Sequence, residues 1–354
     1  MFVSRAYLPA HDRQLALWLL ACALAIYAMI LLGGVTRLTG SGLSMVQWRP
    51  IMGIVPPLGE QAWQEAFEQY RQFPEYQQVN RGMRLGEFKV IFMYEYLHRV
   101  LGRLIGLLFL LPLLLFAVAG RLRPGLWPRL LLLFLLGGCQ GLLGWYMVQS
   151  GLVDRPSVSQ YRLAAHLGLA VALYAAILWQ VMALWPQPHP PAPAPRLRPL
   201  ARAAPLLALL LYLMMLSGAL VAGTDAGHAY PTWPRMGAAL VPPGLYATTP
   251  AWIAAFEDVT TIHFNHRLFA YLLLTLIGVF ALRLWQRAER PALRAAALCL
   301  GGALLLQLGL GIGTVLTQVA VPVAAAHQGG AVLLLTAMLF ALFQLRRAAG
   351  RAQR

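Results

Sequence analysis

The sequence predicts an all-α membrane protein with eight transmembrane helices, arranged as two pseudo-symmetric four-helix bundles that form a parallel repeat. Of the 354 residues, 59% are hydrophobic and only 11% are charged, and the mean hydropathy is +0.64. A soluble domain carries about 25% charged residues. Eight apolar runs have the length of about 20 residues that a bilayer requires.

These apolar runs define the expected membrane spans, in chain order. They cover residues 15–35, 90–120, 130–148, 163–184, 203–221, 259–282, 295–317 and 323–345. An even number of spans places both termini on the same side of the membrane. The first run has no cleavage-site pattern, so we expect it to be retained as a helix.

The distribution of arginine predicts the orientation. The net charge is +16, and most arginines lie at the ends of the apolar runs. This placement is typical of topology determinants and argues against a nucleic-acid partner. Arginine concentrates at the termini and in the segments around 121–129, 185–202 and 283–294. By the positive-inside rule these segments are cytoplasmic, so we expect an inner-membrane bacterial protein with both termini in the cytoplasm.

A proline-rich segment divides the chain into two parts. Residues 185–199 read WPQPHPPAPAPRLRP, a composition that we expect to form a cytoplasmic linker without helix. The predicted domains are therefore an N-terminal half (1–184), the linker (185–202) and a C-terminal half (203–354). Each half has one long outer loop, at 36–89 and at 224–258.

The two halves carry matching polar residues within their spans. Four pairs recur at similar offsets: His98 with His266, Arg99 with Arg267, Gln140 with Gln307, and His166 with His327. Because both halves have four spans, this is a parallel repeat rather than the inverted repeat of many transporters. Four such pairs are strong evidence for the repeat.

The histidines point to a haem in each half. All four are predicted near the outer ends of their helices, where an ionisable side chain is costly and usually faces a partner or a cofactor. One histidine from each of two facing helices can hold an iron porphyrin, so His98 pairs with His166 and His266 with His327. A hydrogen-bonded packing role is the alternative for any single histidine. Zinc is the competing metal, but it prefers clustered tetrahedral ligands.

Three arginines are candidate partners for haem propionates. Arg99 and Arg267 directly follow a predicted ligand, and Arg103 lies one turn after Arg99. Arginine offers bidentate geometry to carboxylates. The alternative, strongest for Arg103, is a side chain that extends towards the membrane surface.

The repeat is broken beside one ligand. Glu95 precedes His98 by three residues, whereas His263 occupies the corresponding position in the second half. A carboxylate at membrane depth is costly, which favours a role in proton transfer. We therefore assign reaction chemistry to the first half and electron transfer to the second. The alternative is a carboxylate that orients a histidine or pairs with Arg99.

Several segments closely resemble haem A synthases of the proteobacterial and mitochondrial kind. They are residues 39–80, EFKVIFMYEYLHRVLGR (87–103), HLGLA (166–170), AGTDAG (222–227), HFNHR (263–267) and AAHQGGA (325–331). The resemblance covers nearly the whole chain. Some family members carry cysteine pairs in their outer loops; here Cys22, Cys139 and Cys299 all lie in apolar runs, so the chain resembles the branch without them.

The resemblance implies an oxidoreductase of haem biosynthesis and cytochrome oxidase assembly. Members oxidise the position-8 methyl of haem O to the formyl group of haem A by successive hydroxylations. His266 and His327 would ligate haem b, while Glu95, His98 and His166 would be catalytic. Expected partners are haem O, haem O synthase, membrane lipid, and a quinol or small redox protein as electron donor; a homo-oligomer is left open. The alternatives are a quinol-linked dihaem b electron carrier and a haem transporter.

Overall fold

The structure is a computed structural model that describes residues 10–47, 55–153, 156–186 and 194–350. Within these ranges, eight helices are long and apolar enough to cross a membrane. They are α1 (Ala10–Leu38), α4 (Leu85–Val118), α5 (Leu126–Gln149), α6 (Gln160–Leu184), α7 (Arg198–Gly223), α9 (Val259–Arg287), α10 (Pro291–Leu316) and α11 (Val321–Ala348). The chain is a multi-pass, all-α membrane protein, as predicted.

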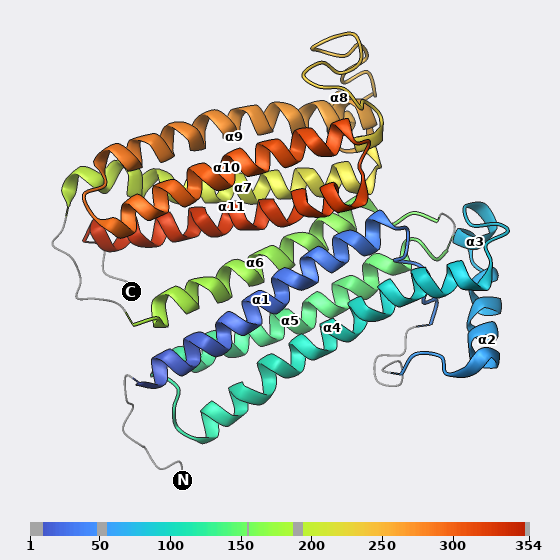
Figure 1. Ribbon diagram of the computed structural model, residues 1–354, viewed down its shortest axis with the longest axis horizontal. Coiled ribbons are helices and arrows are strands. Elements are labelled where there is room, and N and C mark those ends of the chain that lie inside the picture. Colours follow the sequence, from blue (N-terminus) through green and yellow to red (C-terminus); the bar gives the residue numbers. More distant parts are fainter. Residues whose placement is uncertain (1–9, 48–54, 154–155, 187–193, 351–354) are drawn as a thin grey trace.

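The spanning helices lie in two groups, each contiguous in sequence. Figure 1 shows α1, α4, α5 and α6 side by side, here the N-terminal group, and α7, α9, α10 and α11 beside them, here the C-terminal group. The end of α11 and the start of α7 lie together, since Ala194 N–H donates to the carbonyl of Ala348 at 2.8 Å. The halves as separate domains, and their repeat relation, stay predictions with which this grouping agrees.

One apolar core joins the two groups. Buried side chains of α1, α6, α7 and α11 belong to a single contiguous cluster. Matching glycines allow the groups to approach. A Cβ on Gly329 of α11 would lie 2.9 Å from the hydroxyl of Tyr27, and one on Gly168 of α6 would lie 2.8 Å from the hydroxyl of Tyr212. Small residues at such crossings permit the close packing that holds membrane helices together.

A polar contact joins the two groups beside Gly329. Gln328, the residue after His327, donates from Nε2 to the carbonyl of Ile30 on α1 at 2.8 Å. A Cβ on Gly34 would overlap the Gln328 amide. Leu167, the residue after His166, is apolar and packs against the common core.

The helix that follows the proline-rich segment begins earlier than predicted. Residues 195–202 were expected to be linker, but Pro195–Leu197 form a 3₁₀ turn (η2) and α7 begins at Arg198. Proline is tolerated in the first turn of a helix because the N–H groups there have no partner within the helix. Residues 187–193 of the expected linker lie outside the described residues.

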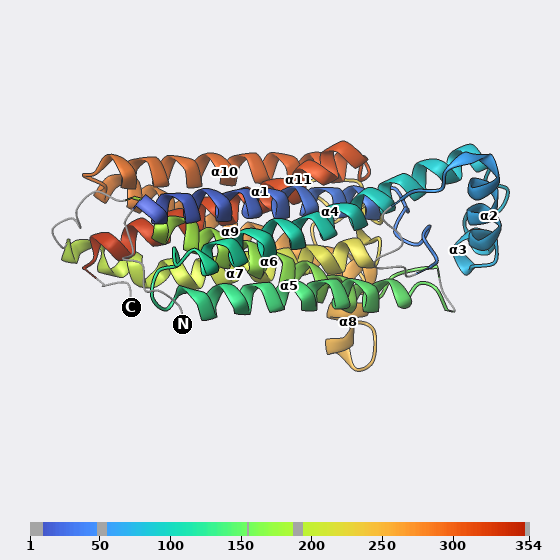
Figure 2. The ribbon, with the colours of Figure 1, turned by 90° about the horizontal axis from the view of Figure 1, so that it is seen from below.

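Part of the first long outer loop is helical. It contains α2 (Gly59–Arg71) and α3 (Pro74–Gln78), which pack on the first turns of α4 and together form what we call the outer lobe. Figure 2 shows α2 and α3 beside the first turns of α4, beyond the ends of the other spanning helices. The second outer loop contains η3 (Ala226–His228) and α8 (Ala251–Glu257). These short helices were not predicted.

The outer lobe has its own aromatic core. Tyr70 and Phe88 are fully buried and stack with ring centroids 5.1 Å apart, while the Trp63 ring meets Phe92 edge-on at 5.1 Å. Aromatic pairs of this kind add to the burial of their large apolar area. The first turns of α4 are therefore held outside the helical bundle by α2.

A carboxyl group is buried within this lobe. Glu75 is 6% exposed, and its Oε2 accepts a hydrogen bond from the Tyr70 hydroxyl at 3.0 Å. Asn80 in turn donates to the Tyr70 oxygen at 2.7 Å. Burial raises the pKa of Glu75 to about 7, although the hydrogen bond from Tyr70 acts in the opposite direction. Burial disfavours the charged form of a carboxyl group.

The stability of the outer lobe should therefore depend on pH. Between the ordinary pKa of 4.5 and the folded value of about 7, the folded lobe binds more protons than the unfolded lobe. Its stability is thus greatest below this window and falls as the pH rises through it. Hydrogen exchange at residues 70–80, corrected for the intrinsic pH dependence of exchange, should show protection that declines from pH 5 to pH 7.5.

Glu75→Gln should remove this decline because the amide does not titrate. Glu68→Gln is the matched control, since Glu68 lies in the same lobe but is exposed and paired with Arg71. Protection in Glu75→Gln that still follows the wild-type pH profile would contradict the assignment.

Candidate functional site

The four predicted histidine ligands lie on four different spanning helices. His98 is on α4, His166 on α6, His266 on α9 and His327 on α11. The imidazole of His98 interacts electrostatically with that of His166, and the imidazole of His327 with that of His266. The predicted pairs are thus brought together, one pair in each group.

The helices of each pair lie diagonally across their group. In the N-terminal group, α1 and α5 each contact both α4 and α6, and in the C-terminal group α7 and α10 each contact both α9 and α11. Because α4 starts five residues earlier than predicted, His98 is about three and a half turns into its helix instead of near its start. The extra turns belong to the outer lobe.

A glycine on a neighbouring helix faces each imidazole. A Cβ added to the glycine would come within 2.9–3.3 Å of the ring in the pairs Gly33 with His98, Gly144 with His166, Gly218 with His266, and Gly311 with His327. Real Cβ contacts are almost always longer than this, so a side chain at these positions would displace the ring. The rings occupy space that only glycine leaves open.

This arrangement fits a metal cofactor that would be held between two imidazoles. Diagonal helices supply one imidazole each, and the glycines keep the intervening helices from filling the space around the rings. Among the described residues, no three His, Cys, Asp or Glu side chains gather at one point, so what the structure offers is paired imidazoles.

Two glutamines contact the second histidine of each pair. Gln140 Nε2 is 3.2 Å from Nδ1 of His166, and Gln307 Nε2 is 3.2 Å from Nδ1 of His327. Within the described residues, the Oε1 atom of each glutamine is buried and has no hydrogen-bond partner. The sequence indicated both glutamines as a repeat pair but assigned them no role.

Ser217 is a contact that the sequence analysis missed. Its Oγ lies 3.1 Å from Nδ1 of His266, and it directly precedes Gly218, the glycine that faces the same ring. The only signal in the sequence was a serine within an apolar run, and serine is common in membrane helices.

Glu95 is buried in a network that includes the N-terminal outer loop. It is 3% exposed, and its Oε1 forms an ion pair with Arg99 Nη2 at 2.6 Å. Its Oε2 accepts hydrogen bonds from Ser44 Oγ at 2.8 Å and from the Met45 N–H at 2.7 Å. Arg99 also donates to the carbonyls of Met45 and Gln47. The pairing of Glu95 with Arg99, left open by the sequence, is present.

Arg267 is the corresponding arginine of the C-terminal group. Its Nε donates to Nε2 of His263 at 3.0 Å, the position that Glu95 holds in the other group. Its remaining nitrogens donate to the carbonyls of Tyr230 at 2.8 Å, Thr232 at 2.9 Å and Arg235 at 3.3 Å. Each arginine therefore ties an outer loop to the helix that carries a predicted ligand.

These contacts bear on the proposed propionate partners. Arg99 and Arg267 donate hydrogen bonds to loop carbonyls. These bonds fix the two guanidinium groups close to the predicted ligands. Arg103 lies one turn after Arg99 on α4 and is partly buried. The propionate role of the three arginines stays a prediction.

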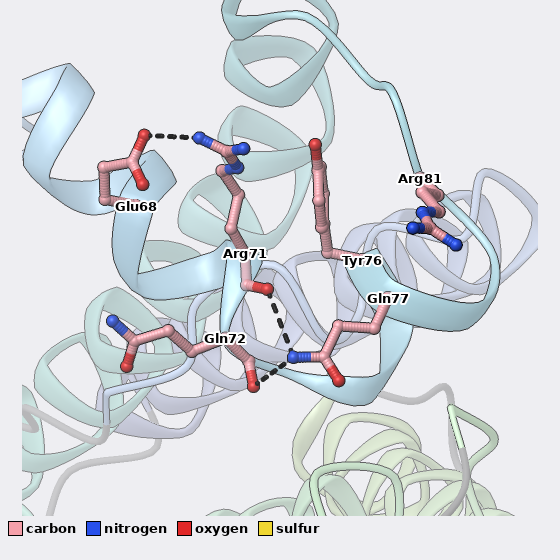
Figure 3. A pocket seen from close by; sticks show the side chains of 6 residues that line it. All are labelled: Glu68, Arg71, Gln72, Tyr76, Gln77 and Arg81. Carbon is pink, nitrogen blue, oxygen red and sulfur yellow. Dashed lines mark hydrogen bonds and ion pairs between the residues drawn. The ribbon is translucent and has the colours of Figure 1, made fainter.

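The outer lobe has a pocket away from the histidines, shown in Figure 3. Arg71 faces Glu68 across it at 2.8 Å and lies over the Tyr76 ring, while Gln77 donates back to the carbonyls of Arg71 and Gln72. The polar groups of the lining side chains largely interact with one another or with nearby carbonyls, and the pocket is distinct from the two histidine sites.

Comparison with known proteins identifies the family. The cytochrome oxidase assembly protein family (COX15-CtaA) matches residues 16–339. Proteins named Heme A synthase from Nitrosomonas eutropha, Rhodospirillum centenum and Nitrosospira multiformis are 48%, 47% and 45% identical to the chain. The alignments cover 96%, 95% and 98% of this chain and 95%, 90% and 99% of the relatives, respectively. The chain belongs to the haem A synthase family. The resemblance noted from the sequence is thereby confirmed.

Because the chain belongs to this family, the haem content of variants can test the glycines that face the imidazoles. Gly311→Ala would place a Cβ 2.9 Å from the ring of His327, a predicted haem ligand. The prediction that this ring ligates haem therefore leads us to expect that the variant loses most of the haem absorbance due to this site. Gly301→Ala on the same helix is the matched control, because a Cβ there has open space around it. Absorbance spectra of the two purified proteins make the comparison. Equal haem content would show that the ring does not need the space opposite Gly311.

Proposed function

We propose that the protein is a haem A synthase that oxidises the position-8 methyl of haem O to a formyl group by successive hydroxylations. The observation that carries this proposal is one imidazole pair in each helix group, with a carboxylate beside only one of them. Haem O occupies the N-terminal site, and a resident haem b in the C-terminal site passes electrons to it. The full-length similarity to proteins named Heme A synthase supports this assignment.

In the N-terminal site, His98 and His166 would hold haem O by its iron, so that its position-8 methyl can be oxidised in that site. Glu95 lies one turn before His98, and its carboxylate is fixed by Arg99, the Ser44 hydroxyl and the Met45 N–H. We assign to Glu95 the transfer of protons released as the methyl is oxidised. The Ser44 hydroxyl, at 2.8 Å from Oε2, is placed to relay that proton towards the outer loop.

In the C-terminal site, His266 and His327 hold haem b, which supplies one-electron chemistry when bound. His263 replaces the carboxylate there, and it accepts a hydrogen bond from Arg267. The Nε2 atom of this imidazole is occupied by the hydrogen bond from Arg267 and so is not open to a proton from the reaction. The C-terminal site is therefore suited to hold a permanent electron carrier.

The same proposal includes the orientation and the partners. Both termini face the cytoplasm of a bacterial cell, and the haem sites lie towards the periplasmic side of the inner membrane. Haem O synthase supplies the substrate, and a quinol or small redox protein supplies electrons. The arginine distribution supports the orientation through the positive-inside rule.

The buried carboxylate provides the first test. Glu95→Gln keeps the shape of the side chain but removes its proton-accepting charge, so haem A formation should fall by about 10²-fold or more. The variant is expressed in a host that makes haem O and lacks its own haem A synthase, and the extracted haems are separated by chromatography. We expect haem O to accumulate while haem b is retained.

Glu87→Gln is the matched control on the same helix, since Glu87 is exposed and only caps the start of α4. It should form haem A normally. Wild-type levels of haem A from Glu95→Gln would remove this residue from the mechanism.

The ligand pairs provide the second test and address the alternative of a dihaem b electron carrier. His266→Ala and His327→Ala should lose haem b absorbance, whereas His98→Ala and His166→Ala should retain it and accumulate haem O in the cell. Pyridine haemochrome spectra of the purified variants measure haem b. A protein that holds two permanent haems b, one of which is lost in His98→Ala, would favour the electron carrier.

A further inference from the structure

A second buried carboxyl group lies close to Glu95. Glu75 on α3 is 6% exposed, and its Oε2 accepts a hydrogen bond from the Tyr70 hydroxyl at 3.0 Å. The Asn80 amide donates to the same hydroxyl at 2.7 Å, so the groups around Glu75 in this network are neutral. Glu95, in contrast, is held as a carboxylate by its ion pair with Arg99. The proton transfer proposed above involves Glu95 and leaves Glu75 without a role.

Both carboxyl groups border the aromatic core of the outer lobe. On α4, Phe88, Phe92 and Glu95 follow one another at steps of four and three residues, which places them on one face of the helix. Phe88 stacks on Tyr70, whose hydroxyl binds Glu75. The two carboxyl groups are close enough to interact electrostatically across this core.

This interaction links the charge of one carboxyl group to the protonation of the other. Burial is the main cause of the raised pKa of Glu75, the hydrogen bond from Tyr70 opposes it, and the negative charge of Glu95 adds to it. Tyr70 from α2 and Glu95 from α4 are the titratable groups that face Glu75 from the elements packed against it. When Glu95 takes up a proton its charge disappears, so Glu75 releases its own proton more readily.

The ion pair of Glu95 with Arg99 gives this release a purpose. A proton on Glu95 removes the negative charge that balances the guanidinium in a buried network. An unbalanced charge away from water is costly. Ionisation of Glu75 returns a negative charge to the same network. Glu75 directly precedes Tyr76, which lines the open pocket in Figure 3, so its proton has a short way to water.

We propose that Glu75 and Glu95 act as a coupled pair in proton transfer. When Glu95 accepts a proton from the N-terminal site, an O–H bond forms on Glu95, the O–H bond of Glu75 breaks, and the Glu75 proton passes to water at the outer surface. Glu95 then passes its proton on through Ser44, and Glu75 takes one back from water, which resets the pair. One proton leaves the site in each cycle, and no electron moves in this step.

The inference rests on the proposed function, which assigns proton transfer to Glu95. Glu75 acts through Glu95 and does not contact the substrate. The net charge of the pair with Arg99 is the same before and after the exchange, because one carboxyl group gains a proton as the other loses one.

Infrared spectra test the coupling without turnover. The Glu75 band is the protonated-carboxyl absorption that Glu75→Gln removes, and its loss with rising pH should have a midpoint at about 7 in the wild type. Glu95→Gln keeps the size of the side chain and removes its charge, so this midpoint should move to lower pH. Retained haem b shows that Glu95→Gln is folded. Glu68→Gln is the matched control, since it removes an exposed charge from the same lobe and should leave the midpoint unchanged.

Glu75→Gln should also slow haem A formation by about tenfold, which corresponds to the loss of one pKa unit of coupling. Glu75 can release a proton only when it is protonated, so wild-type haem A formation should fall as the pH rises through about 7. The variant should be slow and should lack this fall. Hydrogen exchange at residues 70–80 checks that its outer lobe is folded.

Two results would overturn the proposal: a Glu75 midpoint in Glu95→Gln that equals or exceeds the wild-type value, or wild-type rates of haem A formation by Glu75→Gln at every pH. Wild-type protein that forms no haem A from haem O would instead reject the proposed function. The infrared shift does not depend on turnover, so the two failures are distinguishable.

Discussion

The placement of four imidazole rings between closely packed membrane helices is the constraint on which the rest of the structure depends. Each ring needs space, and each receives it from a glycine on an adjacent helix that would otherwise carry a Cβ within 3.3 Å of the ring. Each of three rings also has a polar side chain at Nδ1, from Ser217, Gln140 or Gln307. Polar groups away from water are costly to bury unless they are hydrogen-bonded. These contacts therefore offset part of the free-energy cost of placing histidine at this depth.

The two kinds of chemistry that we propose for the two groups would rest on few changes in a similar arrangement of residues. In both groups an arginine follows the first histidine and binds carbonyls of an outer loop, which covers the outer end of the site. The side chain one turn earlier then differs: Glu95 forms an ion pair with its arginine, and His263 accepts a hydrogen bond from the guanidinium of its arginine. Among the described residues, a carboxylate thus accompanies the arginine beside one histidine pair and an imidazole accompanies it beside the other, while the loops are held by the same kind of contact in both.

The sequence predicted the spanning helices because long apolar runs leave few other structures in a bilayer. It also predicted the histidine pairs, since the matched residues of the two halves place them at corresponding points. It did not predict α2 and α3, because polar amphipathic helices in a loop lack the long apolar signal of a span. The glycines opposite the rings were not recognised either, because glycine is frequent in membrane helices and its neighbour depends on helix rotation. The ion pair of Glu95 with Arg99 was foreseeable from their spacing of four residues, but the bonds to Ser44 and Met45 needed the loop conformation.

The two helix groups contact each other through reciprocal tyrosine–glycine pairs. Tyr27 projects from the N-terminal group into the gap at Gly329, and Tyr212 projects from the C-terminal group into the gap at Gly168. Each group thus carries one knob and one hole, which is the requirement for a self-complementary, isologous surface. The two contacts between the helix groups therefore resemble the reciprocal contacts of a homodimer. Because the two sides belong to one chain they can differ, and they do: Gln328 follows the second histidine on one side and Leu167 on the other.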